Sequence, residues 1–157
     1  MTLKVSRQGP SLTERNLQQF ESTTSIRLPE GYRGFLLQHN SGAPEPESFF
    51  MTRLATGERE EGCIGWLFGI DTGNRDIEIE EVLHTYETRI PDNFLPIATD
   101  PGGNLICLSV YGDDLGMVYF WDHEWELDKG IVAGYENVAF IAQDFPAFLN
   151  SLFSYNE

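Results

Sequence analysis

The sequence is poor in cysteine, which excludes a disulfide framework. Only two cysteines, Cys63 and Cys107, occur among 157 residues, and their spacing does not suit a zinc site either. Both lie inside apolar runs (Gly-Cys-Ile and Ile-Cys-Leu), where a buried, reduced thiol is the usual outcome. We therefore expect two buried thiols that take no part in chemistry.

Positive charge is also scarce. The chain has 10 Lys and Arg residues against 25 Asp and Glu residues, which gives a formal net charge of −15 and a pI near 4.4. Nucleic acids are bound through clustered lysines and arginines, so a nucleic-acid partner is disfavoured, and an anionic membrane surface is disfavoured for the same reason. The negative charge fits plain solubility, and it also fits a basic protein partner that approaches by electrostatic steering.

Long hydrophobic runs and catalytic motifs are missing as well. No run approaches the ~18 apolar residues of a membrane span, and residues 1–10 lack the apolar core of a signal peptide, so we expect a cytoplasmic protein. The sequence has no Gly-x-Ser-x-Gly elbow, and its three histidines lie far apart. Asp122-His123-Glu124 could offer metal ligands together with Asp113 and Asp114, but the turns at 112–116 and 100–104 lack the ligand spacing of a calcium loop. We therefore predict no catalytic residues, no metal and no cofactor.

Apolar and aromatic residues are abundant, at 41% and 13% of the chain, which is enough for a substantial core. The most informative stretch is 93–124. It predicts strands at 94–98, 105–111 and 117–121, because apolar runs alternate there with turns rich in Asp, Pro and Gly. An antiparallel meander at the centre of the protein is the expected result.

Helices are predicted on both sides of this meander in the sequence. Ser11 and Glu14 have the spacing of a capping box, and Pro29 suits the first turn of a second helix. Residues 76–89 keep helical apolar spacing, and Asp144 is expected to cap a last helix.

Further strands are expected at 49–54 and 63–70, joined by a polar connection at 56–62, and a short strand at 138–142. Together these elements predict one α+β domain over residues 1–157, with a central antiparallel sheet and flanking helices.

Several ordered groups of residues resemble the SUKH superfamily, the Smi/Knr-type domain first named from a fungal regulator of cell-wall synthesis. One group precedes and forms the second predicted helix, two lie in the meander, and one forms the closing helix. The matching residues are Leu28, Pro29, Tyr32, Phe35, Leu36, Asn40, Gly42, Leu95 to Ala98, Asp100, Gly102 to Asn104, Ile106 to Leu108, Gly116 to Glu124, and Phe145 to Leu149. The resemblance spans about residues 11–153. One departure is Asn40-Ser41-Gly42, where members often have Asn-Gly-Gly.

The resemblance implies an α+β fold with a central antiparallel sheet, in agreement with the residue patterns. It also implies a class of function. Bacterial members of the superfamily are immunity proteins, which neutralise polymorphic or contact-dependent toxins by binding them, whereas fungal members act in signalling and scaffolding. The superfamily has no shared catalytic site. Residues 55–62 are expected to be specific to this protein, so the identity of a partner does not follow from the resemblance.

The residues themselves suggest where a protein partner would bind. Tyr and Trp side chains rimmed by charge anchor many interfaces. Tyr119 and Trp121 alternate with Phe120 along one strand, which leaves open whether their face is exposed or covered by helices. A meander can also bring the acidic residues of two turn regions and a strand end to one rim. The candidate partner-binding residues are Glu58, Glu60, Glu61, Asp113, Asp114, Tyr119, Trp121, Asp122, Glu124 and Trp125.

Two other functions stay open at this point. A small-ligand binder or an enzyme would use a pocket between sheet and helices near Asp100 and Trp121, lined by titratable groups with perturbed pKa values. An intracellular scaffold or regulatory domain would bind a protein that is not a toxin. A broad acidic face with an apolar centre would favour protein binding over the pocket. The oligomeric state is not predicted.

Overall fold

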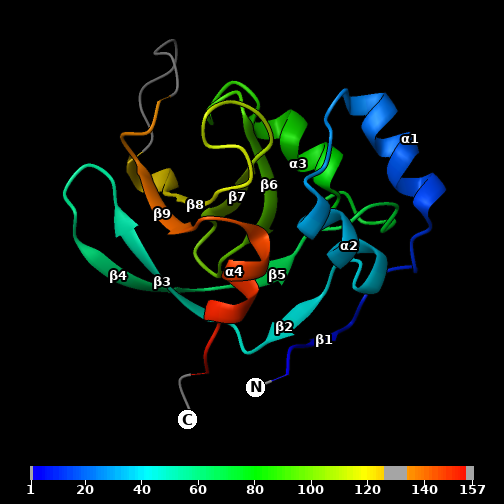
Figure 1. The fold of residues 1–157 in the computed structure, drawn as a ribbon, viewed down its shortest axis with the longest axis horizontal. Helices are drawn as coiled ribbons and strands as arrows, with labels where there is room; N and C mark the ends of the chain where they lie inside the picture. The colour runs from blue at the N-terminus through cyan, green and yellow to red at the C-terminus, as the bar shows by residue number, and fades with distance from the viewer. Residues whose placement is uncertain (1, 126–133, 155–157) are drawn as a thin grey trace.

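The computed structural model, which describes residues 2–125 and 134–154, has a seven-stranded antiparallel sheet with helices packed on it (Figure 1). The strand order is β4-β3-β9-β8-β7-β6-β5, and a second sheet pairs β1 with β2. The strands are β1 (Lys4–Ser6), β2 (Ala43–Glu45), β3 (Ser48–Arg53), β4 (Arg59–Cys63), β5 (Trp66–Leu67), β6 (Phe94–Thr99), β7 (Leu105–Ser109), β8 (Val118–Trp121) and β9 (Val138–Ala142). The helices are α1 (Glu14–Thr24), α2 (Glu30–Gln38), α3 (Ile79–Tyr86) and α4 (Phe145–Ser151), with a short 3-10 helix η1 (His123–Trp125). The predicted α+β fold class is confirmed.

The predicted meander forms from β6, β7 and β8. These strands follow one another in the chain and pair antiparallel, with Cys107 opposite Tyr119. The turn between β6 and β7 is held by Asp100, whose carboxylate accepts the N–H groups of Gly102 and Asn104 at 2.9 and 2.8 Å. Every residue of β7 and β8 is buried, so the meander is the centre of the core as well as of the sequence pattern.

Neighbouring side chains of β8 show which helix covers which face of the sheet. Phe120 packs toward Phe49, which in turn contacts Phe148 of α4, with ring centroids 6.4 and 5.9 Å apart. Trp121 points to the opposite face, because successive side chains of a strand alternate. There the ring of Tyr86 from α3 meets it edge-on at 5.6 Å. Helices α4 and α3 therefore lie on opposite faces, in front of and behind the sheet in Figure 1.

Helix α1 begins two residues later than the sequence suggested. Thr13 is its N-cap and forms a capping box with Asn16, so the prediction of Ser11 as the cap with Glu14 as its partner is wrong. The carboxylate of Glu14 pairs with Arg33 of α2 instead. At the other end of the chain, Asp144 caps α4 as predicted.

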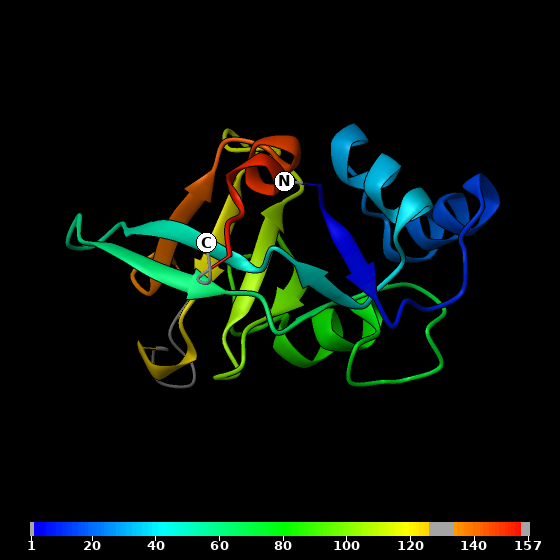
Figure 2. The ribbon, with the colours of Figure 1, turned by 90° about the horizontal axis from the view of Figure 1, so that it is seen from below.

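The segment 59–67 is the main departure from prediction. Residues 59–63 form strand β4, where a polar connection was expected, and pair with β3. β4 and β5 are only two residues apart in the chain, yet they stand at the two ends of the strand order. The sheet must therefore curl until this one segment borders both of its edges. Figure 2 shows the β3–β4 hairpin extending away from the helices.

Within the described part of the chain, every helix falls short of the length and hydrophobicity that crossing a bilayer requires.

Candidate functional site

Arg53 is the centre of a polar cluster at one end of the sheet. It ends β3 and is only 8% exposed. Its guanidinium pairs with Glu60 of β4, and its Nη1 lies 2.9 Å from Oδ2 of Asp122, which follows β8. Burial lowers the pKa of the guanidinium, but hydrogen bonds to Glu60 and Asp122 outweigh burial and raise the pKa above its usual value. Arg53 therefore stays charged and links β3, β4 and the end of β8.

Asp122 also orders the chain that follows β8. Its Oδ1 accepts the N–H of Glu124 at 3.0 Å, and its backbone carbonyl accepts the N–H of Trp125 at 3.3 Å. The side chain of Asn137 donates to the same carbonyl at 2.9 Å. Because Asp122 is 5% exposed, a single buried carboxylate both neutralises Arg53 and sets the start of η1.

Trp125 is the exposed part of this cluster. Half of its surface is open to solvent, and the Cζ atom of Arg53 lies 4.8 Å from the centroid of its ring. The same guanidinium lies 5.7 Å from the ring of Phe120 in the core. Cation–π contact of this kind attracts an aromatic ring without burying it, so Trp125 is fixed in place while remaining available to a partner.

Five of the ten predicted binding residues meet around Arg53. The backbone N–H of Arg53 donates to the carbonyl of Glu58 at 2.8 Å. The exposed side chain of Glu58 therefore lies at the same end of the β3–β4 hairpin as Arg53. Glu124 is exposed on η1. We call the following six residues the Trp125 surface: Arg53, Glu58, Glu60, Asp122, Glu124 and Trp125.

Glu61 lies on the other face of the hairpin. In the β3–β4 ladder Glu60 is opposite Met51 and Glu61 is opposite Phe50. Met51 is buried and Phe50 is 40% exposed, so the two neighbouring glutamates point to opposite sides. The prediction that both belong to one acidic rim is therefore wrong for Glu61.

Tyr119 and Trp121 are buried, at 5% and 0% exposure. The sequence left open whether their face is covered, and the structure covers it with Tyr86 of α3 and with Tyr135, whose ring lies 5.5 Å from that of Tyr119. Because they are buried, these two side chains do not form the exposed anchors that the sequence predicted. Asp122 is buried too, and it supports Trp125 without facing solvent.

Asp113 and Asp114 lie at the far end of the sheet, since they precede β8 whereas Asp122 follows it. The single acidic rim expected from the sequence is thus divided in two. Asp113 is exposed, but Asp114 turns inward. Its carboxylate accepts hydrogen bonds from four side chains, at 2.6 Å from Tyr135, 2.8 Å from Tyr119, 2.8 Å from Ser109 and 3.0 Å from Asn93.

These neutral donors keep Asp114 ionised, and the partners that the described residues give it are all uncharged. Burial raises the pKa of Asp114, but the hydroxyl groups of Tyr135, Tyr119 and Ser109 outweigh burial, so its pKa lies below the usual value. Burial and the nearby carboxylate raise the pKa of Tyr135 to about 12. The arrangement closes one end of the core and presents little of the charge to solvent.

Two grooves of the described surface border α1 or the residues that follow it. One of about 490 Å³ runs between α1 and α2, and one of about 710 Å³ lies between residues 24–27, the end of α3 and Tyr111. Neither Asp100 nor Trp121 lines either groove. These two grooves therefore do not supply the pocket expected near Asp100 and Trp121.

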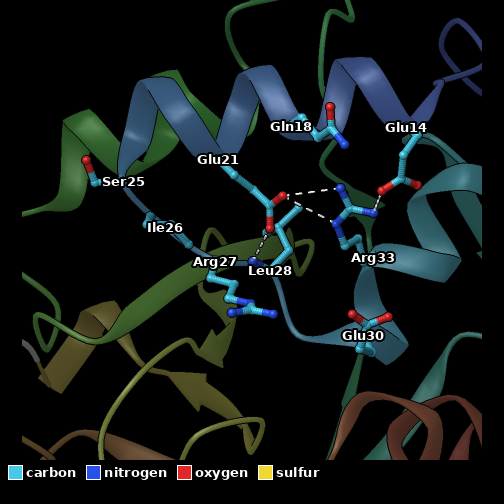
Figure 3. Close-up of a pocket in the computed structure, with 9 residues that line it drawn as sticks. All are labelled: Glu14, Gln18, Glu21, Ser25, Ile26, Arg27, Leu28, Glu30 and Arg33. Carbon is cyan, nitrogen blue, oxygen red and sulfur yellow. Dashed lines mark hydrogen bonds and ion pairs between the residues drawn. The ribbon is translucent and has the colours of Figure 1, made fainter.

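The charges of the α1–α2 groove largely satisfy one another (Figure 3). Arg33 pairs with Glu14 and, at 3.2 Å, with Glu21. The second oxygen of Glu21 accepts the N–H of Leu28 at 2.8 Å. These bonds join α1 to α2, which is a structural task.

Metal binding and thiol chemistry would each require a particular arrangement of the described residues. Within residues 2–125 and 134–154 no group of three or more His, Cys, Asp or Glu side chains could hold a metal ion. Cys107 is buried as expected, and burial raises its pKa. Cys63 is partly exposed, contrary to expectation, but burial and the nearby Asp100 and Glu47 raise its pKa as well, which disfavours the reactive thiolate.

Arg53 is the residue of this cluster that the sequence did not identify. A signal was present, because Arg53 alternates with Phe49 and Met51 and so shares the buried face of β3. A buried arginine requires an acidic partner. The sequence could not identify Asp122 as that partner, since the pairing depends on β9 lying between β3 and β8.

A sequence model of the SMI1 / KNR4 family (SUKH-1) matches residues 11–151. The chain belongs to this family. A relative is the SPbeta prophage-derived uncharacterized protein YokK of Bacillus subtilis (strain 168), which is 28% identical over 140 residues, covering 78% of this chain and 68% of the relative.

Residues that carry the SMI1/KNR4 resemblance build the fold. Asn40 is buried, donates to the carbonyls of Pro10 and Ile70 at 2.7 and 2.8 Å, and accepts the N–H of Ile70 at 2.9 Å. Ser41 has a φ of +68°, which explains why glycine suits this position in other members. Its hydroxyl donates to the carbonyl of Leu67 at 3.0 Å and accepts from the indole of Trp66 at 3.1 Å.

By contrast, Trp125 and the tip of the β3–β4 hairpin lie outside the residues that carry the resemblance. Both are exposed.

Proposed function

We propose that this member of the SMI1/KNR4 family is a cytoplasmic immunity protein that binds a basic toxin domain through the Trp125 surface and blocks it by occlusion. Trp125 is the observation that carries the proposal. It is a half-exposed indole, fixed by a buried and doubly paired arginine, with exposed glutamates at positions 58 and 124. Aromatic anchors surrounded by charge dominate the binding energy of many protein interfaces.

The net charge of −15 supports a basic partner. Complementary charge accelerates the encounter of two proteins, whereas buried anchors slow their separation. The exposed carboxylates of Glu58 and Glu124 would therefore act mainly on the association rate, and Trp125 mainly on the dissociation rate. A toxin domain that acts on nucleic acid carries the positive charge that such steering requires.

The experiment requires a toxin domain encoded beside the gene for this chain, and it expresses that domain with and without the chain in the same cells; the lack of any such toxin gene would count against the proposal. Co-expression should restore growth, and the purified proteins should bind. Trp125→Ala should weaken binding at least about 30-fold, the effect of a hot-spot residue. Tyr111→Ala is the matched control, because Tyr111 is similarly exposed, at 55%, but lies at the far end of the sheet.

Charge reversal separates steering from anchoring. Glu58→Lys with Glu124→Lys should slow association at low salt by about tenfold or more, and the difference should shrink as salt shortens the Debye length below ~8 Å. Asp113→Lys is the control, since Asp113 is exposed at the other end. Equal losses for Trp125→Ala and Tyr111→Ala, or growth arrest despite co-expression, would refute the proposal.

A further inference from the structure

The turn between β6 and β7 reaches the chain after β8 through the side chain of Asn104. Its Nδ2 donates to Oδ2 of Asp100 at 2.9 Å, and its Oδ1 accepts the backbone N–H of His123 at 3.0 Å. The two ends of this carboxamide cannot be exchanged, because an ionised carboxylate only accepts hydrogen bonds and a backbone N–H only donates one. Asn104 therefore links Asp100 to the first residue of η1 in one defined orientation.

Asp100 fixes the near side of this link. Its Oδ1 accepts the backbone N–H groups of Gly102 and Asn104 at 2.9 and 2.8 Å, so one carboxylate both shapes the turn and orients the amide. The ring of His123 adds a second contact, because its Nε2 lies 2.9 Å from the carbonyl oxygen of Gly102. The turn thus meets the start of η1 at two points.

The far side of the link is the segment that carries Trp125. Helix η1 begins at His123 and ends at Trp125, and a 3-10 helix of this length has few hydrogen bonds of its own. Its placement therefore depends on the side chains around it. Asn137 supports it from the start of β9 by donating to the carbonyl of Asp122 at 2.9 Å, and Asn104 supports it from the β6–β7 turn.

We propose that Asn104 is a positioning residue of the Trp125 surface, because it sets the start of η1 and thereby the place of the Trp125 ring against Arg53. The Cζ atom of Arg53 lies 4.8 Å from the centroid of that ring, and cation–π attraction acts only within about 6 Å. A ring that is already held in place loses less conformational freedom when a partner binds. The effect on toxin binding rests on the function proposed above, whereas the effect on the free chain does not.

An exchange of the two side chains tests the link, because it keeps every one of these hydrogen bonds. In the double variant Asp100→Asn/Asn104→Asp, the amide at position 100 still accepts the two N–H groups of the turn and donates to the carboxylate at position 104. That carboxylate still accepts the N–H of His123, and the net charge equals that of the wild type. Each single variant breaks the link. Asn104→Asp places two carboxylates against each other, and Asp100→Asn leaves one donor facing another in every orientation of the two amides.

Fluorine NMR of the chain labelled with fluorotryptophan reads the position of Trp125 in the absence of a toxin. The chain has three tryptophans, and Trp125→Phe identifies the line that belongs to Trp125. Asn104→Ala and Asn104→Asp should both move that line toward the position of free fluorotryptophan, because the ring leaves the guanidinium. The exchange variant should return the line to its wild-type position.

Asn93→Ala is the matched control. Asn93 and Asn104 are both partly buried, and Asn93 donates to Asp114 at 3.0 Å much as Asn104 donates to Asp100, but at the far end of the sheet. Asn93→Ala should therefore lower thermal stability and leave the Trp125 line in place. A loss of stability alone does not reproduce the effect expected of Asn104→Ala.

Toxin binding supplies the second readout. Asn104→Ala should weaken it about five- to tenfold, mainly through faster dissociation, the exchange should restore it, and Asn93→Ala should leave it unchanged. A Trp125 line that stays in place in the folded Asn104 variants, or an exchange variant that does not restore the line, would overturn the proposal. If Trp125→Ala leaves toxin binding unchanged, the toxin-binding proposal fails, and the line of Trp125 still decides the role of Asn104.

Discussion

The two ends of the central sheet each hold an aspartate, but the partners that surround the two carboxylates differ. At one end Asp122 is buried against the charged Arg53, and this ion pair supports a half-exposed Trp125. At the other end Asp114 is surrounded by neutral hydroxyl and amide donors, with Tyr119 buried beneath it. Both aspartates occur in similar sequence contexts, next to β8. The charged pair builds a surface that a partner can reach, whereas the neutral network seals the core.

The difference has an energetic cause. Removing one member of a buried ion pair leaves an uncompensated charge, which costs more than losing one of several neutral hydrogen bonds. A single substitution at the Asp122 end should therefore cause a large loss of stability, whereas single substitutions at the Asp114 end should each cause a small loss. Three stability measurements test this contrast, from the largest expected effect to the smallest.

Arg53→Met should reduce the free energy of unfolding by about 3–5 kcal/mol, because Asp122 would stay buried without its cation. Chemical denaturation followed by circular dichroism measures the loss. Arg75→Met is the control, since the Arg75–Glu81 pair is exposed and its atoms are 3.6 Å apart; exposed pairs contribute about 0–1 kcal/mol. The double variant Arg53→Met/Asp122→Asn should recover part of the loss, because no buried charge remains. A cost for Arg53→Met no larger than that for Arg75→Met would contradict the account of this end.

Asp114 should make stability depend on pH in the acid range. Its pKa in the folded protein lies below the usual value of 3.8, so the folded state favours the ionised form. The resulting stabilisation is present above that usual pKa and is lost as pH falls through the lower folded pKa. Wild type should therefore lose more stability than Asp114→Asn between neutral and acid pH. Asp113→Asn, which changes an exposed neighbour, should keep the wild-type pH dependence; a flat difference between wild type and Asp114→Asn would exclude the proposed network.

The contrast between the two ends also shows how far the sequence can predict the structure. The meander was predictable because β6, β7 and β8 are apolar runs separated by turns of Asp, Pro and Gly. Strand β4 was not, because Arg59, Glu60 and Glu61 lie on a hairpin edge with little burial, so no apolar alternation marks them. Whether the face that carries Tyr119 and Trp121 is exposed or covered could not be decided from the sequence either. Alternation fixes that they share a face, but only the packing of α3 and Tyr135 buries it.

The candidate site was predictable only in part, for a related reason. Composition and turn chemistry identified acidic residues on both sides of β8, and Glu60, Asp122 and Trp125 do come together. What joins them is Arg53, whose partners come from β4 and from the chain after β8. The contact with Asp122 is set by strand order, because β9 lies between β3 and β8, and strand order leaves no local signal.

Tyr135→Phe is the smallest of the expected effects, at about 1–2 kcal/mol of unfolding free energy. The substitution removes the hydroxyl that donates to Asp114 at 2.6 Å, and a hydrogen bond to a charged group contributes about 1.5–3 kcal/mol. Asp114 keeps its bonds from Tyr119, Ser109 and Asn93, which should bring the cost to the lower part of that range. A double-mutant cycle with Asp114→Asn isolates the bond, because the effect of Tyr135→Phe should shrink once the carboxylate is neutral. An undiminished effect would mean that Tyr135 acts through ring packing on Phe94 and Tyr119, and the sealed end would then depend on aromatic contacts more than on its carboxylate.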